Sequence, residues 1–153
     1  MTSRLIIGLI VSVLIGSVSS TVSAASDPTN FLFRKLSFSS AENDQLFRKT
    51  IEEVDALEFE EAGANSNSLV TNVEADNRID GLTFARVLAN AAIIYAQLEQ
   101  PEVALELLNR SVSLVEEESV FHEDIYPLMM VKAQILIKQG KLAEAIDQLR
   151  RAQ

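Results

Sequence analysis

An internal repeat, in which residues 94–108 recur at 135–149, constrains the fold of this chain most strongly. The segment "IYAQLEQPEVALELL" at 94–108 matches "ILIKQGKLAEAIDQL" at 135–149. The two segments are offset by 41 residues (135 − 94), and the same offset pairs residues of similar size: Leu88 with Met129, Ala92 with Ala133, Ala104 with Ala145, and Leu108 with Leu149. Self-similarity at such a period is typical of proteins that stack copies of one supersecondary unit.

Each copy of the repeat predicts a helical hairpin. Two antiparallel helices approach closely only where small side chains lie at their crossing, and Ala92 with Ala104, like Ala133 with Ala145, suits that position. Pro101 fits the first turn of a helix, where its missing N–H costs nothing and its fixed φ is already helical. We therefore expect Pro101 to begin the second helix of its hairpin.

Helical periodicity extends over most of the chain, and no strand-like alternation competes with it. Ser39 and Glu42 resemble a capping box before the first amphipathic helix. Helices are predicted over 40–61, 82–98, 101–117, 123–139 and 142–152. The intervening segment 62–80 contains Gly63, several Asn and Ser residues and few apolar residues, and predicts a linker that is either mobile or partly helical.

The repeat resembles the tetratricopeptide repeat (TPR), a helix-turn-helix unit, with a longer period like that of the elongated repeats of kinesin light chain. The motif positions in the first unit are Leu88, Ala92, Tyr95, Glu99, Ala104, Leu108 and Ser111. Those in the second are Met129, Ala133, Leu136, Gly140, Ala145, Leu149 and Ala152. Glu99 and Ser111 depart from the motif's glycine and alanine. The resemblance covers about 72 of 153 residues and implies an all-α, TPR-like α-solenoid of about two repeats plus an N-terminal helix.

The composition of residues 1–25 is typical of a secretory signal peptide. Arg4 is followed by an apolar run and by small residues that end at Ala24. A transmembrane anchor is the alternative, but the run is roughly half the ~20 residues that span a bilayer. The chain has no cysteine for a lipoprotein anchor. We expect an exported protein, periplasmic or secreted, without membrane insertion after cleavage, divided into 1–25, an N-terminal part at 26–80 and a repeat domain at 81–153.

Charge narrows the classes of ligand. Cleavage after residue 25 removes one arginine and no acid, leaving 12 basic and 22 acidic residues, a net charge of −10. So acidic a protein is a poor match for nucleic acid or anionic lipid, which require clustered Lys and Arg. Without cysteine the fold depends on packing alone.

No constellation typical of catalysis is evident, so we expect no enzyme and no cofactor. His122 is the only histidine, and it lacks the further ligands of a metal site. The acidic residues between Glu52 and Glu61 predict a solvated helix face. The five glycines form no phosphate-binding loop.

The resemblance implies a concave groove that binds a peptide or a partner helix. Its outward positions would be Arg86, Ala89, Asn90, Ile93 and Gln97 in one unit, and Pro127, Met130, Val131, Gln134 and Lys138 in the next. Ala89, Ile93 and Val131 replace the polar residues with which some relatives clamp a C-terminal carboxylate. We predict no preference for acidic C-terminal peptides.

Residues 26–38 form a Phe-rich apolar arm. It either covers its own domain or acts as a self-ligand or dimer contact. The final "LRRAQ" is still within the last repeat helix, so its apolar edge is covered by another molecule or by the arm, or the sequence is a fragment. The main function expected is an exported module that binds a protein partner. The alternatives are a structural self-association module or a truncated N-terminal part of a larger envelope scaffold protein.

Overall fold

The computed structural model describes residue 29, residues 32–118 and residues 123–151, and this part of the chain is all-helical. The helices are α2 (Ala41–Asp55), α3 (Phe59–Ala75), α4 (Gly81–Gln97), α5 (Pro101–Glu118), α6 (Ile125–Lys138) and α7 (Leu142–Arg151). The predicted all-α class is confirmed. The predicted signal peptide and His122 lie outside the described residues.

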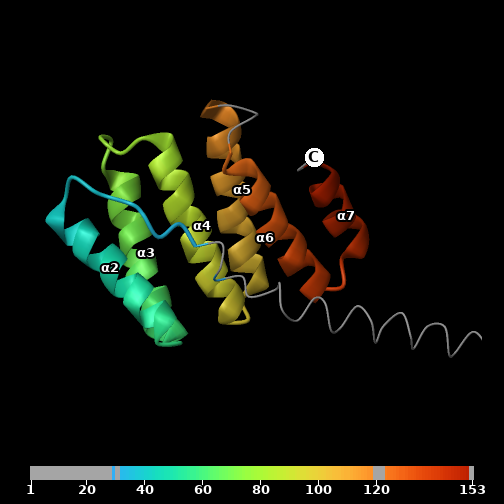
Figure 1. Ribbon diagram of the computed structural model, residues 1–153, viewed down its shortest axis with the longest axis horizontal. Helices are drawn as coiled ribbons and strands as arrows, with labels where there is room; N and C mark the ends of the chain where they lie inside the picture. The colour runs from blue at the N-terminus through green and yellow to red at the C-terminus, as the bar shows by residue number, and fades with distance from the viewer. Residues whose placement is uncertain (1–28, 30–31, 119–122, 152–153) are drawn as a thin grey trace, which may run out of the picture.

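The helices lie side by side in chain order as antiparallel hairpins α2–α3, α4–α5 and α6–α7 (Figure 1). Neighbouring hairpins pack through α3 against α4 and through α5 against α6. The central helix α4 is buried on almost all sides from Val87 to Ile94. It is the most enclosed helix of the molecule because α3, α5 and the arm all pack against it.

Alanines occupy the predicted crossings of the last two hairpins. Ala92 and Ala104 are fully buried between α4 and α5, and Ala133 and Ala145 are almost fully buried between α6 and α7. Pro101 is the first residue of α5, as predicted. The predicted helices 82–98, 101–117, 123–139 and 142–152 each begin and end within two residues of α4, α5, α6 and α7.

The same turn closes all three hairpins. Leu57, Glu99 and Gly140 have φ of 63°, 57° and 75°, in the left-handed region. The amide after each donates to a carbonyl five residues earlier: Glu58 to Glu53 at 2.8 Å, Gln100 to Tyr95 at 3.0 Å, and Lys141 to Leu136 at 2.9 Å. The second helices begin at Phe59, Pro101 and Leu142, so the first hairpin keeps nearly the same period as the other two. The hairpin α2–α3 thus has the turn of the two recognised repeats.

The predicted helix over 40–61 and the predicted linker over 62–80 are both wrong in extent. Helix α2 ends at Asp55 because the chain turns at Leu57, and α3 continues to Ala75. Three of the small residues that resemble a linker, Ala62, Gly63 and Ser66, are buried. A Cβ on Gly63 would lie only 2.9 Å from Leu98 Cδ1. Only residues 76–80 connect α3 to α4.

The start of α2 also differs from the predicted capping box. Its N-cap is Ser40, whose Oγ accepts from the amide of Asn43 at 3.5 Å. Glu42 is exposed, whereas Asn43 is buried and its Oδ1 accepts from Asn72 Nδ2 at 3.1 Å. The N-cap therefore lies one residue later than predicted, at Ser40 instead of Ser39. The third residue of the helix is Asn43, which contacts α3 through Asn72, where the predicted capping box has Glu42.

The matched turns give a paired prediction. Gly140→Ala should lower the free energy of unfolding by about 1 kcal/mol, because alanine disfavours a positive φ. No heavy atom lies within 4 Å of the added Cβ, so no clash adds to this cost. Glu99→Gly should raise stability by a smaller amount. Urea denaturation of both variants checks this, and shifts of the same sign would contradict it.

Candidate functional site

Within the predicted arm at 26–38, residues 32–38 form an extended segment that lies across the helices (Figure 1). From here on, the arm means residues 32–38. It leads from α4 to the start of α2, passing in front of α3 in this view. Leu32 and Phe38, at its two ends, are each only 8% exposed. The arm covers its own domain, which is the first of the two alternatives predicted for it.

The side chain of Asn90 holds the arm by its backbone. Asn90 Oδ1 accepts from the amide of Phe33 at 2.7 Å, and its Nδ2 donates to the carbonyl of the same residue at 2.9 Å. This exchange of two bonds with one residue resembles the pairing of neighbouring antiparallel strands. Asn90 is 5% exposed, so the bonds are shielded from water. The contact requires an extended backbone and no particular side chain.

Arg86 lies one helical turn before Asn90 and contacts the side chain of Phe33. Its guanidinium lies 5.7 Å from the centre of the ring, a cation–π arrangement. Arg86 Nε also donates to Asp124 Oδ2 at 2.7 Å, and this hydrogen bond raises the pKa of Arg86. The buried carboxylate of Asp124, just before α6, thereby holds the guanidinium in place over the arm.

Arg34 forms a forked ion pair with Asp55 at the end of α2. The two guanidinium nitrogens lie 3.1 and 2.9 Å from the two carboxylate oxygens. Both side chains are about half exposed, so the pair adds orientation and only modest stability. The hydrogen bonds from Arg34 lower the pKa of Asp55 and raise that of Arg34.

The Asp55 carboxyl gives a direct measure of this contact. We expect NMR titration to find its pKa below the usual aspartate value, and Arg34→Ala to return it to that value. Because the folded pKa is lowered, the pair contributes above the ordinary pKa and is lost as pH falls through the folded one. An unchanged titration in Arg34→Ala would contradict the contact.

The other end of the arm is fixed to α2. The rings of Phe38 and Phe47 meet edge to face, with centroids 5.8 Å apart and planes at 62°. The amide of Phe38 donates to Asp44 Oδ1 at 2.9 Å. These contacts position the arm immediately before α2 begins and direct it toward α4.

A hollow of about 420 Å³ remains beside the arm. It is lined by arm residues 32–36 and by Arg86, Glu123 and Asp124. The exposed Glu123 and the nearby Asp55 make the surroundings of the arm acidic, opposite in charge to its two basic residues, Arg34 and Lys35. Charge and shape at this site therefore match a basic, extended chain.

Only part of the predicted groove on α4 contacts the arm. Arg86 and Asn90 bind the arm, Ile93 belongs to the same buried cluster as Leu32, and Gln97 is half-buried. Ala89 is buried with Ile93 rather than open to a ligand.

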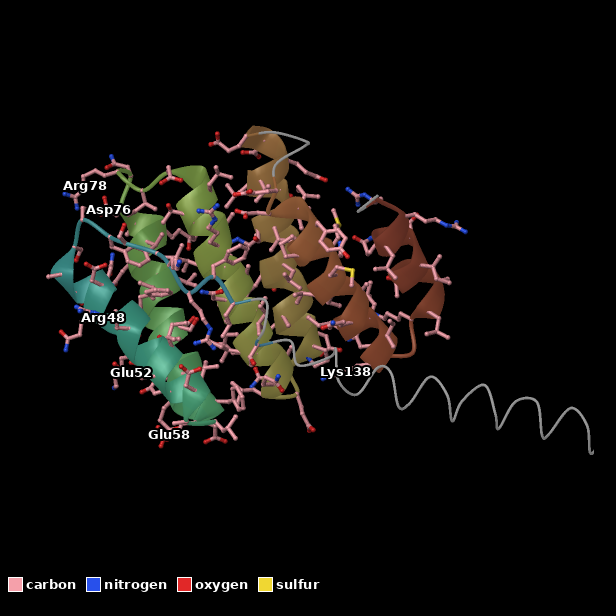
Figure 2. All side chains as sticks on the ribbon, viewed as in Figure 1. Arg48, Glu52, Glu58, Asp76, Arg78 and Lys138 are labelled. Carbon is pink, nitrogen blue, oxygen red and sulfur yellow. The ribbon has the colours of Figure 1, made fainter. Side chains whose placement is uncertain are left out.

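The predicted groove residues of α6 are partly accessible. Pro127, Met130 and Gln134 are half-buried, and Val131 is buried in the core. Lys138 is exposed at the end of α6 (Figure 2). The Oε1 atom of Gln134 is buried without a hydrogen-bond partner. This part of the predicted groove therefore offers side chains to a further ligand.

Sequence reasoning missed the acidic partners of the arm. The sequence places Asp55 on the solvated acidic face and Asp124 at the start of the predicted helix 123–139, and nothing in their local pattern distinguishes them from their neighbours. Glu53 was likewise assigned to that face, but it is 7% exposed and both its oxygens accept from Asn65 Nδ2 at 2.8 Å. Glu52 on α2 and Glu58, just before α3, are exposed, as predicted, and Arg48 on α2 is exposed as well (Figure 2).

The described residues contain no group of three or more His, Cys, Asp or Glu side chains that could hold a metal ion. Among the helices they form, none is long and apolar enough to cross a membrane. No protein-family model matches the sequence. No curated protein and no solved structure is significantly similar to it.

Proposed function

We propose that this chain is an exported protein-interaction module, a TPR-like stack of helical hairpins that binds an extended segment of a partner protein. The observation that carries the proposal is the pair of hydrogen bonds from Asn90 to the backbone of Phe33. A face that already holds one extended segment by its main chain has the chemistry to hold another.

The repeated hairpin supports the stacked arrangement. Three consecutive hairpins share one turn geometry, and each packs on the next. The first helices of two hairpins carry contacts of the arm, through Asp55 of α2 and Asn90 of α4. Asp124, immediately before the first helix of the third hairpin, lines the hollow beside the arm. In a stack, such a row of first helices forms one continuous binding surface.

Export and an acidic body fit the same proposal. Residues 1–25 have the pattern of a secretory signal, which directs the module to the periplasm or outside the cell. The net charge of −10 after its removal favours a protein ligand with basic residues over nucleic acid. The module acts by binding and performs no catalysis.

Photocrosslinking in the native cell envelope tests the proposal. A photoreactive residue at Gln134 or Lys138 reports on the face of α6 that remains accessible, and one at the exposed Glu106 of α5 is the matched control. We expect capture of one protein from the α6 positions and not from α5. Equal capture from all three positions, or none from a folded protein, would contradict binding at this face.

Self-association is a second candidate, favoured by the last hairpin. Ile137, Leu142 and Ile146 of α6 and α7 are 49%, 59% and 51% exposed. Exposed large apolar side chains on one hairpin favour contact with another protein surface.

Sedimentation at micromolar concentration tests this second candidate. We expect the chain without residues 1–25 to form dimers, and the double substitution Leu142→Glu and Ile146→Glu to be monomeric. The isosteric change Glu144→Gln on the same helix is the control. A monomer in all three cases would rule out self-association through α7.

A further inference from the structure

The surface on which the arm lies is called the arm site below, and it includes Asp55, Arg86, Ala89, Asn90 and Ile93. We infer that the arm site specifically binds an extended segment of another protein that carries an aliphatic residue, an aromatic residue and an arginine in this order. The inference rests on the proposed function and adds the chemistry of the partner. In the structure the chain's own Leu32, Phe33 and Arg34 occupy the arm site, so the arm competes intramolecularly with any partner segment that binds there.

Each of the three side chains Leu32, Phe33 and Arg34 contacts a different part of the arm site. Leu32 enters a buried cluster that includes Ala89 and Ile93, which requires an aliphatic side chain of similar size. The ring of Phe33 lies under the guanidinium of Arg86 at 5.7 Å, which favours an aromatic side chain.

The charge of Asp55 selects the residue at the third position, which Arg34 occupies. Asp55 accepts from two nitrogens of Arg34, at 3.1 and 2.9 Å. This forked geometry favours arginine over lysine. An acidic residue here would face Asp55, with Glu123 and Asp124 lining the adjacent hollow. The site therefore disfavours acidic segments.

The arm is tethered close to the surface that it occupies. Only Ser39 and Ser40 separate Phe38 from the first residue of α2. A tether this short gives an effective concentration on the order of millimolar. A free peptide with the same contacts should therefore displace the arm only near that concentration, whereas a partner that also contacts α6 can do so at lower ones.

A spin label on the full chain without residues 1–25 measures displacement directly. The chain has no cysteine, so Lys35→Cys gives one labelling site on the exposed side of the arm, and Lys141→Cys gives a control outside it. The probe is the peptide TNFLFRKLSF, identical to residues 29–38, with blocked ends. We expect it to mobilise the label at 35, with half-displacement on the order of 1 mM, and to leave the label at 141 unchanged.

Peptide variants test the reading of the segment. Glutamate in place of the peptide's arginine should weaken displacement roughly fivefold, through loss of the pair and repulsion by Asp55. A scrambled peptide of the same composition should not displace the arm. Equal displacement by the scrambled peptide, or none by the arm peptide, would overturn the inference.

A second variant removes the competitor. Leu32→Asp with Arg34→Glu loosens the arm, and the labelled peptide should then bind at least roughly tenfold more tightly than to the parent chain, by fluorescence anisotropy. Adding Asn90→Leu should abolish this gain. If the loosened chain loses helicity by circular dichroism, the spin-label displacement in the parent chain decides the question alone.

The outcomes separate this inference from the proposed function. Protein capture at Lys138 without displacement by the arm peptide would keep the interaction module and overturn the stated partner chemistry. If the mobility of the label at position 35 depends on protein concentration in the absence of peptide, the arm site binds the arm of a second copy, and this result also overturns the inference. Displacement in the stated order of peptides supports it, whatever the crosslinking finds.

Discussion

Replacing Leu108 with alanine is expected to lower the free energy of unfolding by about 3 kcal/mol, within the roughly 2–5 kcal/mol typical of a buried leucine. Leu108 is fully buried on α5 and belongs to the hydrophobic cluster that also contains Ile94 and Leu128. These residues come from α4 and α6, so the side chain packs where two hairpins meet. Its removal leaves a cavity at the contact that holds the stack together.

The repeat supplies a matched control for this prediction. Leu149 takes the position of Leu108 in the next hairpin, but it is only half-buried on α7. We expect Leu149→Ala to cost about 1 kcal/mol, because less of its surface leaves water on folding. Chemical denaturation of both variants decides the point. Equal losses would show that repeat position, rather than burial between hairpins, determines the contribution.

Asn90→Leu is expected to cost about 2 kcal/mol and to free the arm, because unpaired polar groups that stay buried cost about 1–3 kcal/mol each. Leucine has the same branching and the same number of side-chain heavy atoms as asparagine, so α4 can remain intact, but the amide and carbonyl of Phe33 lose their partners. The arm avoids part of that cost by detaching. Asn109→Leu, on the exposed face of α5, is the control and should change stability by less than about 0.5 kcal/mol.

Limited proteolysis separates detachment of the arm from global unfolding. Arg34 and Lys35 are adjacent and exposed within the arm, and trypsin cleaves after both once the segment can enter its active site. We expect cleavage there to be at least roughly tenfold faster in Asn90→Leu than in the parent chain. If the helices are cut at the same increased rate, the substitution has destabilised the whole fold and has not released the arm specifically.

The sequence predicts the last two hairpins well because their periodicity, their crossing alanines and Pro101 agree. The hairpin α2–α3 was missed for two physical reasons. Its turn is closed by Leu57 at a positive φ, which no propensity rule assigns to leucine. Its second helix packs small residues against α4, so its composition resembles a linker. One signal was present: Ala62 precedes Ala104 by nearly the same interval that separates Ala104 from Ala145.

The candidate site was predicted in part. Arg86 and Asn90 were placed on a groove through the TPR resemblance, and the structure brings both against the arm. The occupant could not be predicted, because Asn90 binds Phe33 across 57 residues of sequence. The same holds for Asp124, which is 38 residues from Arg86. Contacts of this range depend on how hairpins stack, which helical periodicity does not encode.

Helix α4 holds an extended segment by its backbone, and hydrogen exchange at single amides tests this contact most directly. The amide of Phe33 donates to Asn90 and that of Phe38 to Asp44. We expect both to exchange at least roughly a hundredfold more slowly than in an unfolded chain. Asn90→Leu should remove the protection at Phe33 while α4 stays protected. Free exchange at Phe33 in the parent chain, with α4 protected, would contradict the account.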